Sequence, residues 1–238
     1  MPRLVMPGVE ACRVVRKETD TVLLAFSSGK DSVVAWLRLR QIFPRVIPFY
    51  MFLVPDLHFV EVGLRYYEDY FGTKIHRVPH PSLYRMLDRD VYQPPDRLDI
   101  TRRCRLPTFE HKELEQWVCE DFNLDRRKIF VATGIRAADT PHRRMFLART
   151  GPIDWKNRRF YPVHDVNKAT LILMMKKAGL KLPPDYAMFG RSFDGIGYQY
   201  LEPISRHYPK DFKRILDFFP LADLELFRAS MRARHGTS

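Results

Sequence analysis

The stretch TVLLAF-SSGKDS-VVAWLRLR, residues 21–40, decides the fold of this 238-residue chain. Residues 21–26 form a short, nearly continuous apolar run, which is typical of a central parallel strand buried on both faces. Residues 27–31 interrupt that pattern, and residues 32–40 continue with helical character until Pro44 closes the helix. We therefore predict a strand, a tight loop and a helix in direct succession.

The same alternation continues along the chain. Apolar runs at residues 46–54, 74–78 and 128–133 predict three further buried strands. The periodicity of residues 59–71 and 109–122 predicts helices between them. Strands that alternate with helices at this spacing are typical of a parallel, doubly wound sheet, so the predicted fold class is α/β.

The remainder of the chain is less regular. Residues 89–106, which carry two prolines and several charges, predict a long exposed loop or lid. Residues 168–178 predict a helix, and residues 182–209, rich in glycine, proline and aromatic residues, predict irregular structure packed on the sheet. Two short helices split at Pro220 are expected to follow. We place a soft domain boundary near residue 165.

The cysteines and the hydropathy limit the class of protein. Cys12, Cys104 and Cys119 are the only cysteines, and an odd number without a Cys-x-x-Cys pair predicts neither a disulfide framework nor a zinc or iron–sulfur site. No apolar stretch approaches the roughly 20 residues that would span a bilayer. The N-terminus also lacks the features of a signal peptide. We therefore expect a cytoplasmic protein with no membrane partner.

The loop at residues 27–32 is the strongest candidate for a functional site. The first turn of a helix has N–H groups without intrahelical acceptors and a partial positive charge, so oxyanions bind there. Gly29 lets the backbone turn tightly and approach a ligand closely. The side chains that could contribute are the hydroxyls of Ser27, Ser28 and Ser32, the ammonium group of Lys30 and the carboxylate of Asp31. The loop predicts phosphate binding, and a serine-capped helix start without a ligand is the alternative.

Two common phosphate-binding patterns do not fit this loop. A Walker A loop needs a glycine where Leu24 stands and a serine or threonine where Asp31 stands. The dinucleotide-binding fingerprint needs three glycines, and this loop holds one. The loop therefore belongs to neither class.

The sequence SSGKDS resembles the pyrophosphate-binding loop S-G-G-x-D-S of the adenine nucleotide α-hydrolase-like superfamily, the PP-loop ATP pyrophosphatases. More narrowly, the chain is similar to the phosphoadenosine phosphosulfate reductase family. Further segments agree in the same order, and they are residues 54–56 (VPD) with 59–61 (FVE), 133–144 (TGIRAADTPHRR), 161–166 (YPVHDV) and 182–186 (LPPDY). The resemblance covers about residues 20–190.

The resemblance implies a five-stranded parallel sheet with ATP or phosphoadenosine phosphosulfate along its carboxyl edge, and with Mg²⁺ bridging phosphates. It implies a nucleotide-binding domain over residues 1–165 and a helical or irregular extension over residues 166–238. The candidate catalytic residues are Lys30 and Asp31. The candidate nucleotide-binding residues are Ser27, Ser28, Gly29, Lys30, Asp31, Ser32, Asp56, Gly134, Arg136, Arg143 and Arg144.

Several of these residues carry a specific expectation. Gly134 would open the crevice after the fourth strand, and Arg136, Arg143 and Arg144 would contact phosphate oxygens. Asp56 would hydrogen-bond a ribose or cap the helix that follows it. Asp31 would help to hold Mg²⁺ or fix the loop through backbone N–H groups.

Two departures from the family pattern matter. Ser28 stands where the family usually has glycine, which asks whether the backbone there needs a positive φ. The reductases attack sulfate with a cysteine near the C-terminus, and no cysteine follows Cys119. Because a thiol nucleophile has no substitute here, we do not expect this chain alone to reduce sulfate.

The functional hypothesis is a transferase that cleaves ATP to AMP and pyrophosphate and so adenylates an acceptor, for sulfur or nitrogen insertion into a nucleic acid. One alternative is an enzyme that uses phosphoadenosine phosphosulfate with a thiol from a separate sulfur-donor or reductase protein. Another is a non-catalytic module that binds a nucleotide or nucleic acid.

The charge of the chain bears on the acceptor. Forty Lys and Arg stand against 28 Asp and Glu, a net charge of +12, which concentrates polyanions around the protein. A solvated basic surface and a tRNA or DNA partner both fit this number. If the surplus serves a nucleic acid, the clusters at residues 102–105, 126–128 and 156–159 should lie on one face around the nucleotide crevice.

Overall fold

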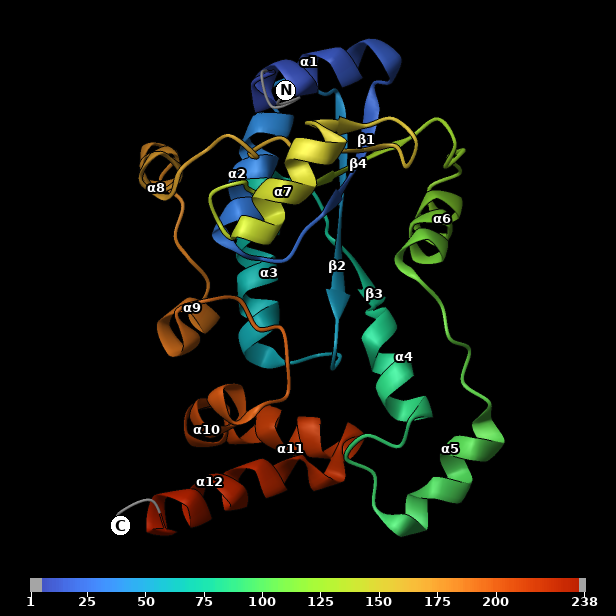
Figure 1. Ribbon diagram of the computed structural model, residues 1–238, viewed down its shortest axis with the longest axis vertical. Helices are drawn as coiled ribbons and strands as arrows, with labels where there is room; N and C mark the ends of the chain where they lie inside the picture. Colours follow the sequence, from blue (N-terminus) through green and yellow to red (C-terminus); the bar gives the residue numbers. More distant parts are fainter. Residues whose placement is uncertain (1–5, 236–238) are drawn as a thin grey trace. The chain divides into compact units, whose positions relative to one another are not determined.

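The computed structural model describes residues 6–235 (Figure 1). By its internal contacts the chain divides into two compact units, each assembled from separate stretches of sequence. The first unit comprises Met1–Met51, Glu68–Arg77 and Glu115–Leu182, and the second comprises Phe52–Tyr67, Val78–Leu114 and Pro183–Ser238. The division therefore differs from the predicted boundary near residue 165.

The apolar core of the second unit explains that difference. Leu57 and Phe59, from the first third of the sequence, are buried in one cluster with Ile204, Ile215 and Phe219 from the last quarter. Burial of apolar surface holds these distant segments together, whatever their separation along the chain. A boundary at one point in the sequence cannot describe such a unit.

The sheet has six strands in the order β3-β2-β1-β4-β6-β5. Their bounds are β1 (Thr21–Ala25), β2 (Arg45–Phe52), β3 (His76–Pro79), β4 (Phe130–Thr133), β5 (Ile153–Asp154) and β6 (Arg159–Phe160). β1 pairs in parallel with β2 and β4, β4 pairs in parallel with β6, and β5 is antiparallel to β6. The α/β fold class and the four predicted strands are confirmed.

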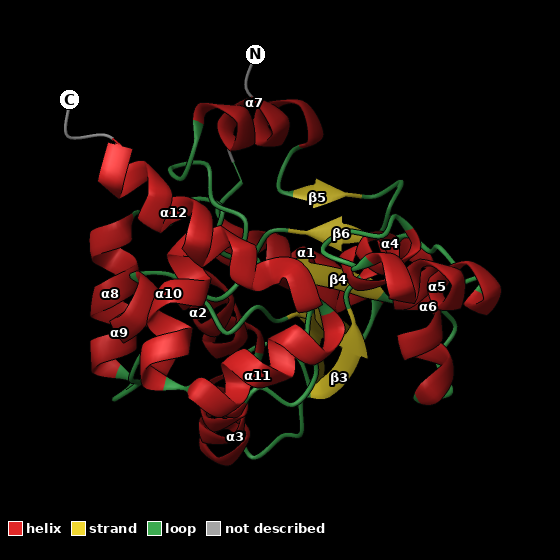
Figure 2. Cartoon of the chain, turned by 90° about the horizontal axis from the view of Figure 1, so that it is seen from below, coloured by secondary structure: helices red, strands yellow, loops and turns green. Residues whose placement is uncertain are grey.

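The predicted count of five parallel strands is wrong because the chain adds a short hairpin. β5 and β6 have two residues each, and they follow β4 in the sheet (Figure 2). Asn157 closes the turn between them by donating from its N and Nδ2 to the Asp154 carboxylate, at 3.0 and 2.7 Å. Two-residue strands are too short to show an alternating pattern.

The strand–loop–helix unit at residues 21–40 forms as predicted. Val22, Leu23 and Leu24 of β1 are fully buried, and α2 begins at Lys30. The other helices with residues in the first unit are α1 (Gly8–Glu18), α3 (His58–Phe71), α6 (His111–Asp121), α7 (Pro141–Thr150) and α8 (Lys168–Lys177). α3 and α6 also contribute residues to the second unit.

The second unit is more helical than predicted. It holds α4 (Pro81–Asp88), η2 (Pro95–Arg97), α5 (Leu98–Cys104), α9 (Pro184–Phe189), α10 (Tyr198–His207), α11 (Pro209–Phe218), η3 (Pro220–Asp223) and α12 (Leu224–His235). α10 packs against both α11 and α12 (Figure 1). The break at Pro220 is confirmed, because Pro220 begins η3 between α11 and α12.

Two predictions of irregular structure are wrong for a shared reason. Residues 89–106 contain α5, and residues 182–209 contain α9 and α10. Several of their prolines and glycines mark helix ends, and Pro203 lies inside α10. Pro184 occupies the first turn of α9, and Gly190 ends that helix with φ +68°.

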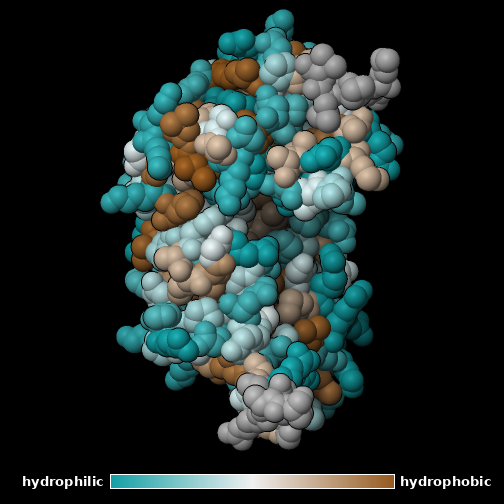
Figure 3. Space-filling model, turned by 60° about the vertical axis from the view of Figure 1, so that its left-hand side comes forward, coloured by the Kyte–Doolittle hydropathy of each residue, from teal (hydrophilic) through white to brown (hydrophobic). Residues whose placement is uncertain are grey.

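On the face shown in Figure 3, hydrophilic residues predominate and hydrophobic residues form separate small patches. Within residues 6–235, the structure contains no helix that is both long enough and apolar enough to cross a bilayer.

Candidate functional site

The loop between β1 and α2 has the backbone shape that its sequence suggested. Ser28, which stands where the similar family has glycine, is buried and adopts φ +59°. A left-handed conformation costs a non-glycine residue about 1–2 kcal/mol, so the surrounding contacts must hold it. The question raised by Ser28 is therefore answered, because the loop does need a positive φ at this position.

Ser32 supplies the contacts that hold the loop. Its buried Oγ donates to the carbonyl of Gly29 at 2.9 Å and accepts from the N–H of Ser27 at 3.2 Å. The Ser27 hydroxyl lies 3.2 Å from the same oxygen. The Ser32 hydroxyl thus ties both ends of the loop together. The N–H groups of the first turn of α2 keep the geometry that suits an anion.

Gly134 lies directly against that first turn. It follows β4, whose last residue, Thr133, is in register with Ala25 at the end of β1. A Cβ on Gly134 would come within 2.8 Å of the Ser32 backbone nitrogen and 2.9 Å of the Asp31 carbonyl carbon. Real Cβ atoms do not approach backbone so closely. The glycine is therefore required for β4 and α2 to meet.

This close approach gives a direct test. Gly134→Ala should displace the first turn of α2 and lower the free energy of unfolding by about 1–3 kcal/mol, the usual cost of overpacking. Nucleotide affinity should fall with it. Calorimetry and equilibrium binding of a nonhydrolysable ATP analogue measure the two effects. Gly72→Asn is the control, because Gly72 is open around its Cβ position and Asn tolerates its φ of +63°. Unchanged stability and binding in Gly134→Ala would contradict the packing argument.

Arg136 is buried and paired with other residues of the protein. Its side chain is only 4% exposed, and its Nε lies 2.7 Å from Asp31 Oδ1. Its other nitrogens donate to the Val166 carbonyl, at 3.1 Å, and to the Asp139 carboxylate. The guanidinium group is therefore engaged by other residues of the protein. Arg136 therefore positions Asp31, and its position does not favour direct contact with phosphate.

Further ion pairs extend from Arg136 and Asp31 towards the surface. Asp139 also accepts from Arg143, whose Nη1 lies 2.6 Å away. The side chain of Thr140 caps α7 by accepting from the Arg143 N–H at 3.1 Å. Arg143 and Arg144 are exposed in the first turns of α7. The structure therefore brings Lys30, Asp31, Gly134 and Arg136 together, and leaves Arg144 at the surface of the same unit.

Asp56 belongs to the second unit. Its carboxylate is exposed and lies 2.6 Å from Arg214 Nη2. The expectation that Asp56 caps the following helix is wrong, because Asp211 occupies that position. The Asp211 carboxylate accepts from the N–H groups of His58 and Phe59, at 2.9 and 3.1 Å.

One residue at the site was missed by sequence reasoning. The Thr133 hydroxyl is buried and has no hydrogen-bond partner in the described part of the chain. A buried polar group without a partner is costly, so the Thr133 hydroxyl is a candidate for contact with a ligand or an ordered water. A threonine at the carboxyl end of a strand, just before a required glycine, is the signal that could have found it.

The cysteines do not form a reactive group. Burial raises the pKa of the Cys12 thiol to about 12 and that of Cys119 to about 11, so both stay protonated near neutral pH. Cys104 is exposed and lies at the end of α5 in the second unit. No cluster of three or more His, Cys, Asp or Glu side chains that could hold a metal occurs among residues 6–235.

A variant without Cys12, Cys104 and Cys119 tests whether a thiol takes part. We expect it to keep ATP binding and cleavage between the α- and β-phosphates, because Cys12 and Cys119 are protonated and buried. Replacement of each cysteine by alanine or serine should keep the fold, and circular dichroism checks that it does. If the well-folded variant binds ATP but no longer cleaves it, Cys104 becomes the candidate relay. Restoring Cys104 alone would then restore cleavage.

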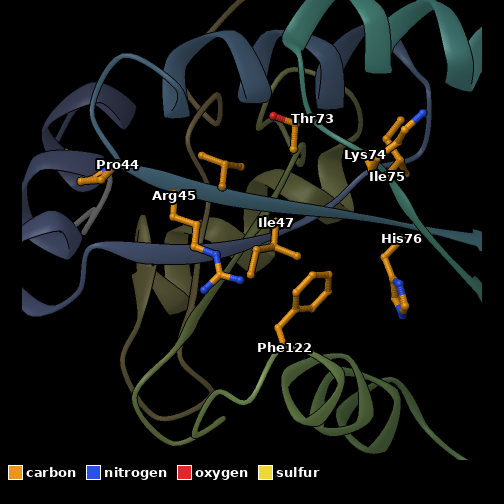
Figure 4. Close-up of a pocket in the computed structure, with 9 residues that line it drawn as sticks. Pro44, Arg45, Ile47, Thr73, Lys74, Ile75, His76 and Phe122 are labelled. Carbon is orange, nitrogen blue, oxygen red and sulfur yellow. The ribbon is translucent and has the colours of Figure 1, made fainter.

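The opposite edge of the sheet carries other features. A pocket of about 370 Å³ lies beside the amino end of β2 (Figure 4). Arg45 and Ile47 line it together with Lys74, His76 and Phe122. Because β1 and β2 are parallel, this pocket and the loop after β1 lie at opposite edges. The pocket is therefore separate from the candidate phosphate site.

Two of the three basic clusters lie at this amino edge as well. Residues 126–128 precede β4, and residues 156–159 lead into β6. Both strands run parallel to β1, so their amino ends point away from the loop. Strand direction places these two clusters at the edge opposite the loop, so they do not have the arrangement expected if the surplus charge serves a nucleic acid at the nucleotide crevice. The cluster at residues 102–105 belongs to the second unit.

No protein-family model and no curated protein matches the chain. Among solved structures, it is similar to an NH3-dependent NAD synthetase from Campylobacter jejuni subsp. jejuni in complex with the nitrate ion. The two share 13% sequence identity, the match covers 95% of each chain, and the TM-score is 0.46. A likeness this slight bears on neither activity nor ligand, so the case for a function rests on the loop itself.

Proposed function

We propose that the protein is an ATP-dependent activating enzyme of the PP-loop type, which cleaves ATP to AMP and pyrophosphate and transfers the adenylate to an acceptor. The observation that carries the proposal is the loop geometry. A left-handed Ser28, a bracing Ser32 and a required Gly134 shape the start of α2 at the carboxyl edge of a parallel sheet. Ligands of open α/β sheets bind at that edge.

The loop would act on the leaving group. An acceptor oxygen forms a bond to the α-phosphorus, and the bond from that phosphorus to the oxygen that bridges to the β-phosphorus breaks. The electron pair departs on pyrophosphate. The N–H groups at the start of α2 and the Lys30 ammonium stabilise that developing charge. Because these groups are held in place beforehand, the chain pays little to reorganise them.

Asp31 is suited to a second task. Its Oδ1 faces Arg136 and its Oδ2 lies 3.3 Å from Lys30 Nζ, so the carboxylate is fixed at the start of α2. Mg²⁺ is commonly bound through one or two carboxylates together with substrate phosphates. One fixed carboxylate fits that mode of binding, and Asp31 would hold the ion. When bound, Mg²⁺ would neutralise phosphate charge.

Isotope exchange tests the proposal. The protein is incubated with ATP, Mg²⁺, labelled pyrophosphate and either bulk tRNA or DNA. Label appearing in ATP supports reversible adenylation, and AMP should accumulate when unlabelled ATP is supplied with the acceptor and a nitrogen or sulfur nucleophile that displaces the AMP. Lys168→Ala serves as the control for loop variants. Lys168 begins α8 as Lys30 begins α2, but lies outside the loop.

Other products identify the alternatives. Sulfite from labelled phosphoadenosine phosphosulfate and a dithiol protein such as thioredoxin would favour the reductase. ADP and phosphate from ATP would contradict α–β cleavage. Tight ATP binding with no product under either condition would favour a non-catalytic nucleotide-binding module.

A further inference from the structure

An exposed tryptophan lies among cations at the amino edge of the sheet. Trp155, in the turn between β5 and β6, is 53% exposed. Its ring meets the buried ring of Phe130 edge-on, with centroids 5.6 Å apart. The Arg158 guanidinium lies 5.0 Å from the centre of the same ring. Phe130 thus holds both side chains at the surface.

The turn that carries Trp155 is fixed in shape. Asp154 accepts two hydrogen bonds from Asn157 across it. Arg158 adopts φ +48°, a conformation that a non-glycine residue keeps only when its neighbours enforce it. A turn held in this way loses little conformational entropy when a ligand binds.

A buried carboxylate determines which of the nearby cations are structural. The Glu115 side chain is 3% exposed and binds Arg126, at 2.7 Å, and Arg159. Arg126 also donates to the Asn157 carbonyl at 3.4 Å, which joins the turn before β4 to the turn before β6. Arg126 and Arg159 are therefore structural. The turn keeps Lys156 and the half-buried Arg158 beside the exposed Trp155, and we call these three residues the hairpin patch.

We propose that the hairpin patch binds single-stranded nucleic acid, with a base stacked on Trp155 and phosphates on the surrounding cations. A half-exposed indole beside cations provides the two elements that such sites combine, a stacking platform and a positive track for the backbone. Bases of a single strand are free to stack on a side chain, whereas those of a duplex are stacked on each other. The patch lies at the edge opposite the loop, so the proposal goes beyond the proposed ATP function and does not depend on it.

The first experiment measures stacking. Fluorescently labelled 12-nucleotide poly(U) and poly(dT) are titrated with the full-length protein at low salt. Trp155→Leu should weaken binding about tenfold, the effect of losing one stacked base. Trp117→Leu is the matched control, because Trp117 is 44% exposed on α6 beside Glu113 and Glu120. The control should bind as the unaltered protein does.

The second experiment measures charge. Lys156→Gln and Arg158→Gly should each reduce the slope of log K against log salt by about 0.7. Glycine at position 158 accepts the left-handed backbone, so that variant removes the guanidinium without straining the turn. Lys168→Gln, on α8, should leave the slope unchanged. ATP affinity should not change in any of these variants.

Fluorescence shows whether the indole itself touches the ligand. In a Trp117→Phe background the remaining tryptophans are Trp155 and the buried Trp36. Poly(U) should quench the emission that iodide also quenches. No binding at low salt would overturn the proposal. So would binding that the charge variants weaken but Trp155→Leu does not, particularly if heparin competes equally well, because the patch would then be a general polyanion surface.

Discussion

Lys30→Ala is expected to lower kcat/KM for ATP about 10²–10³-fold, the effect of losing one donor directed at developing charge, about 2.7–4 kcal/mol of barrier. Lys30 begins α2, and its ammonium lies 3.3 Å from Asp31 Oδ2. The partly buried side chain packs at the loop, yet it carries little of the core. The free energy of unfolding should therefore change by about 0.5 kcal/mol or less.

Pyrophosphate exchange and urea unfolding, run side by side, separate the two effects. Lys168→Ala, at the equivalent position of α8, should keep full exchange. Lys30→Arg should recover part of the activity, because the charge returns with a different shape. Full activity in Lys30→Ala would remove Lys30 from the site. Loss of activity with early unfolding would show that the residue acts through the fold.

Asp31→Ala should behave differently from Lys30→Ala. From the sequence alone, both substitutions are expected to cost turnover more than folding. The structure changes this for Asp31, whose carboxylate is the partner of the buried Arg136. Because Arg136 keeps Asp139 and the Val166 carbonyl, the loss should stay below the roughly 3–5 kcal/mol typical of a broken buried pair. Compared with Asp31→Ala, Asp31→Asn should restore more of the stability than of the activity.

The largest effect on stability is expected at Glu115. Glu115→Ala removes the carboxylate shared by Arg126 and Arg159, and leaves two largely buried guanidinium groups without it. Breaking a buried pair in this way costs about 3–5 kcal/mol. Urea unfolding measures the loss. Glu120→Ala, an exposed position on the same helix, should stay within about 0.5 kcal/mol.

A compensating variant makes the test specific. When Glu115, Arg126 and Arg159 are all replaced by apolar residues of similar volume, most of the lost stability should return, because no charge is left buried. If Glu115→Ala costs less than about 1 kcal/mol of stability, water reaches both arginines. Arg126 and Arg159 would then not have the structural role described above. The ion pairs of Glu115 would then not be what holds the hairpin patch in place.

The sequence by itself determined the elements whose causes are local. A strand buried on both faces must be apolar throughout, so residues 21–26 were recognisable as β1. The start of α2 and the prediction that its loop binds phosphate follow from neighbouring residues, and the break at Pro220 follows from the chemistry of proline. These features need no knowledge of distant segments.

Only the tertiary structure decided which distant residues meet. Gly134 is required because β4 brings it against Ser32, and Arg136 is paired within the protein because Asp31 and Asp139 lie within reach. The position of a charge cluster relative to the loop depends on strand direction, which one-dimensional spacing does not contain. Such contacts join residues about a hundred positions apart, and their geometry arises only when the core has formed.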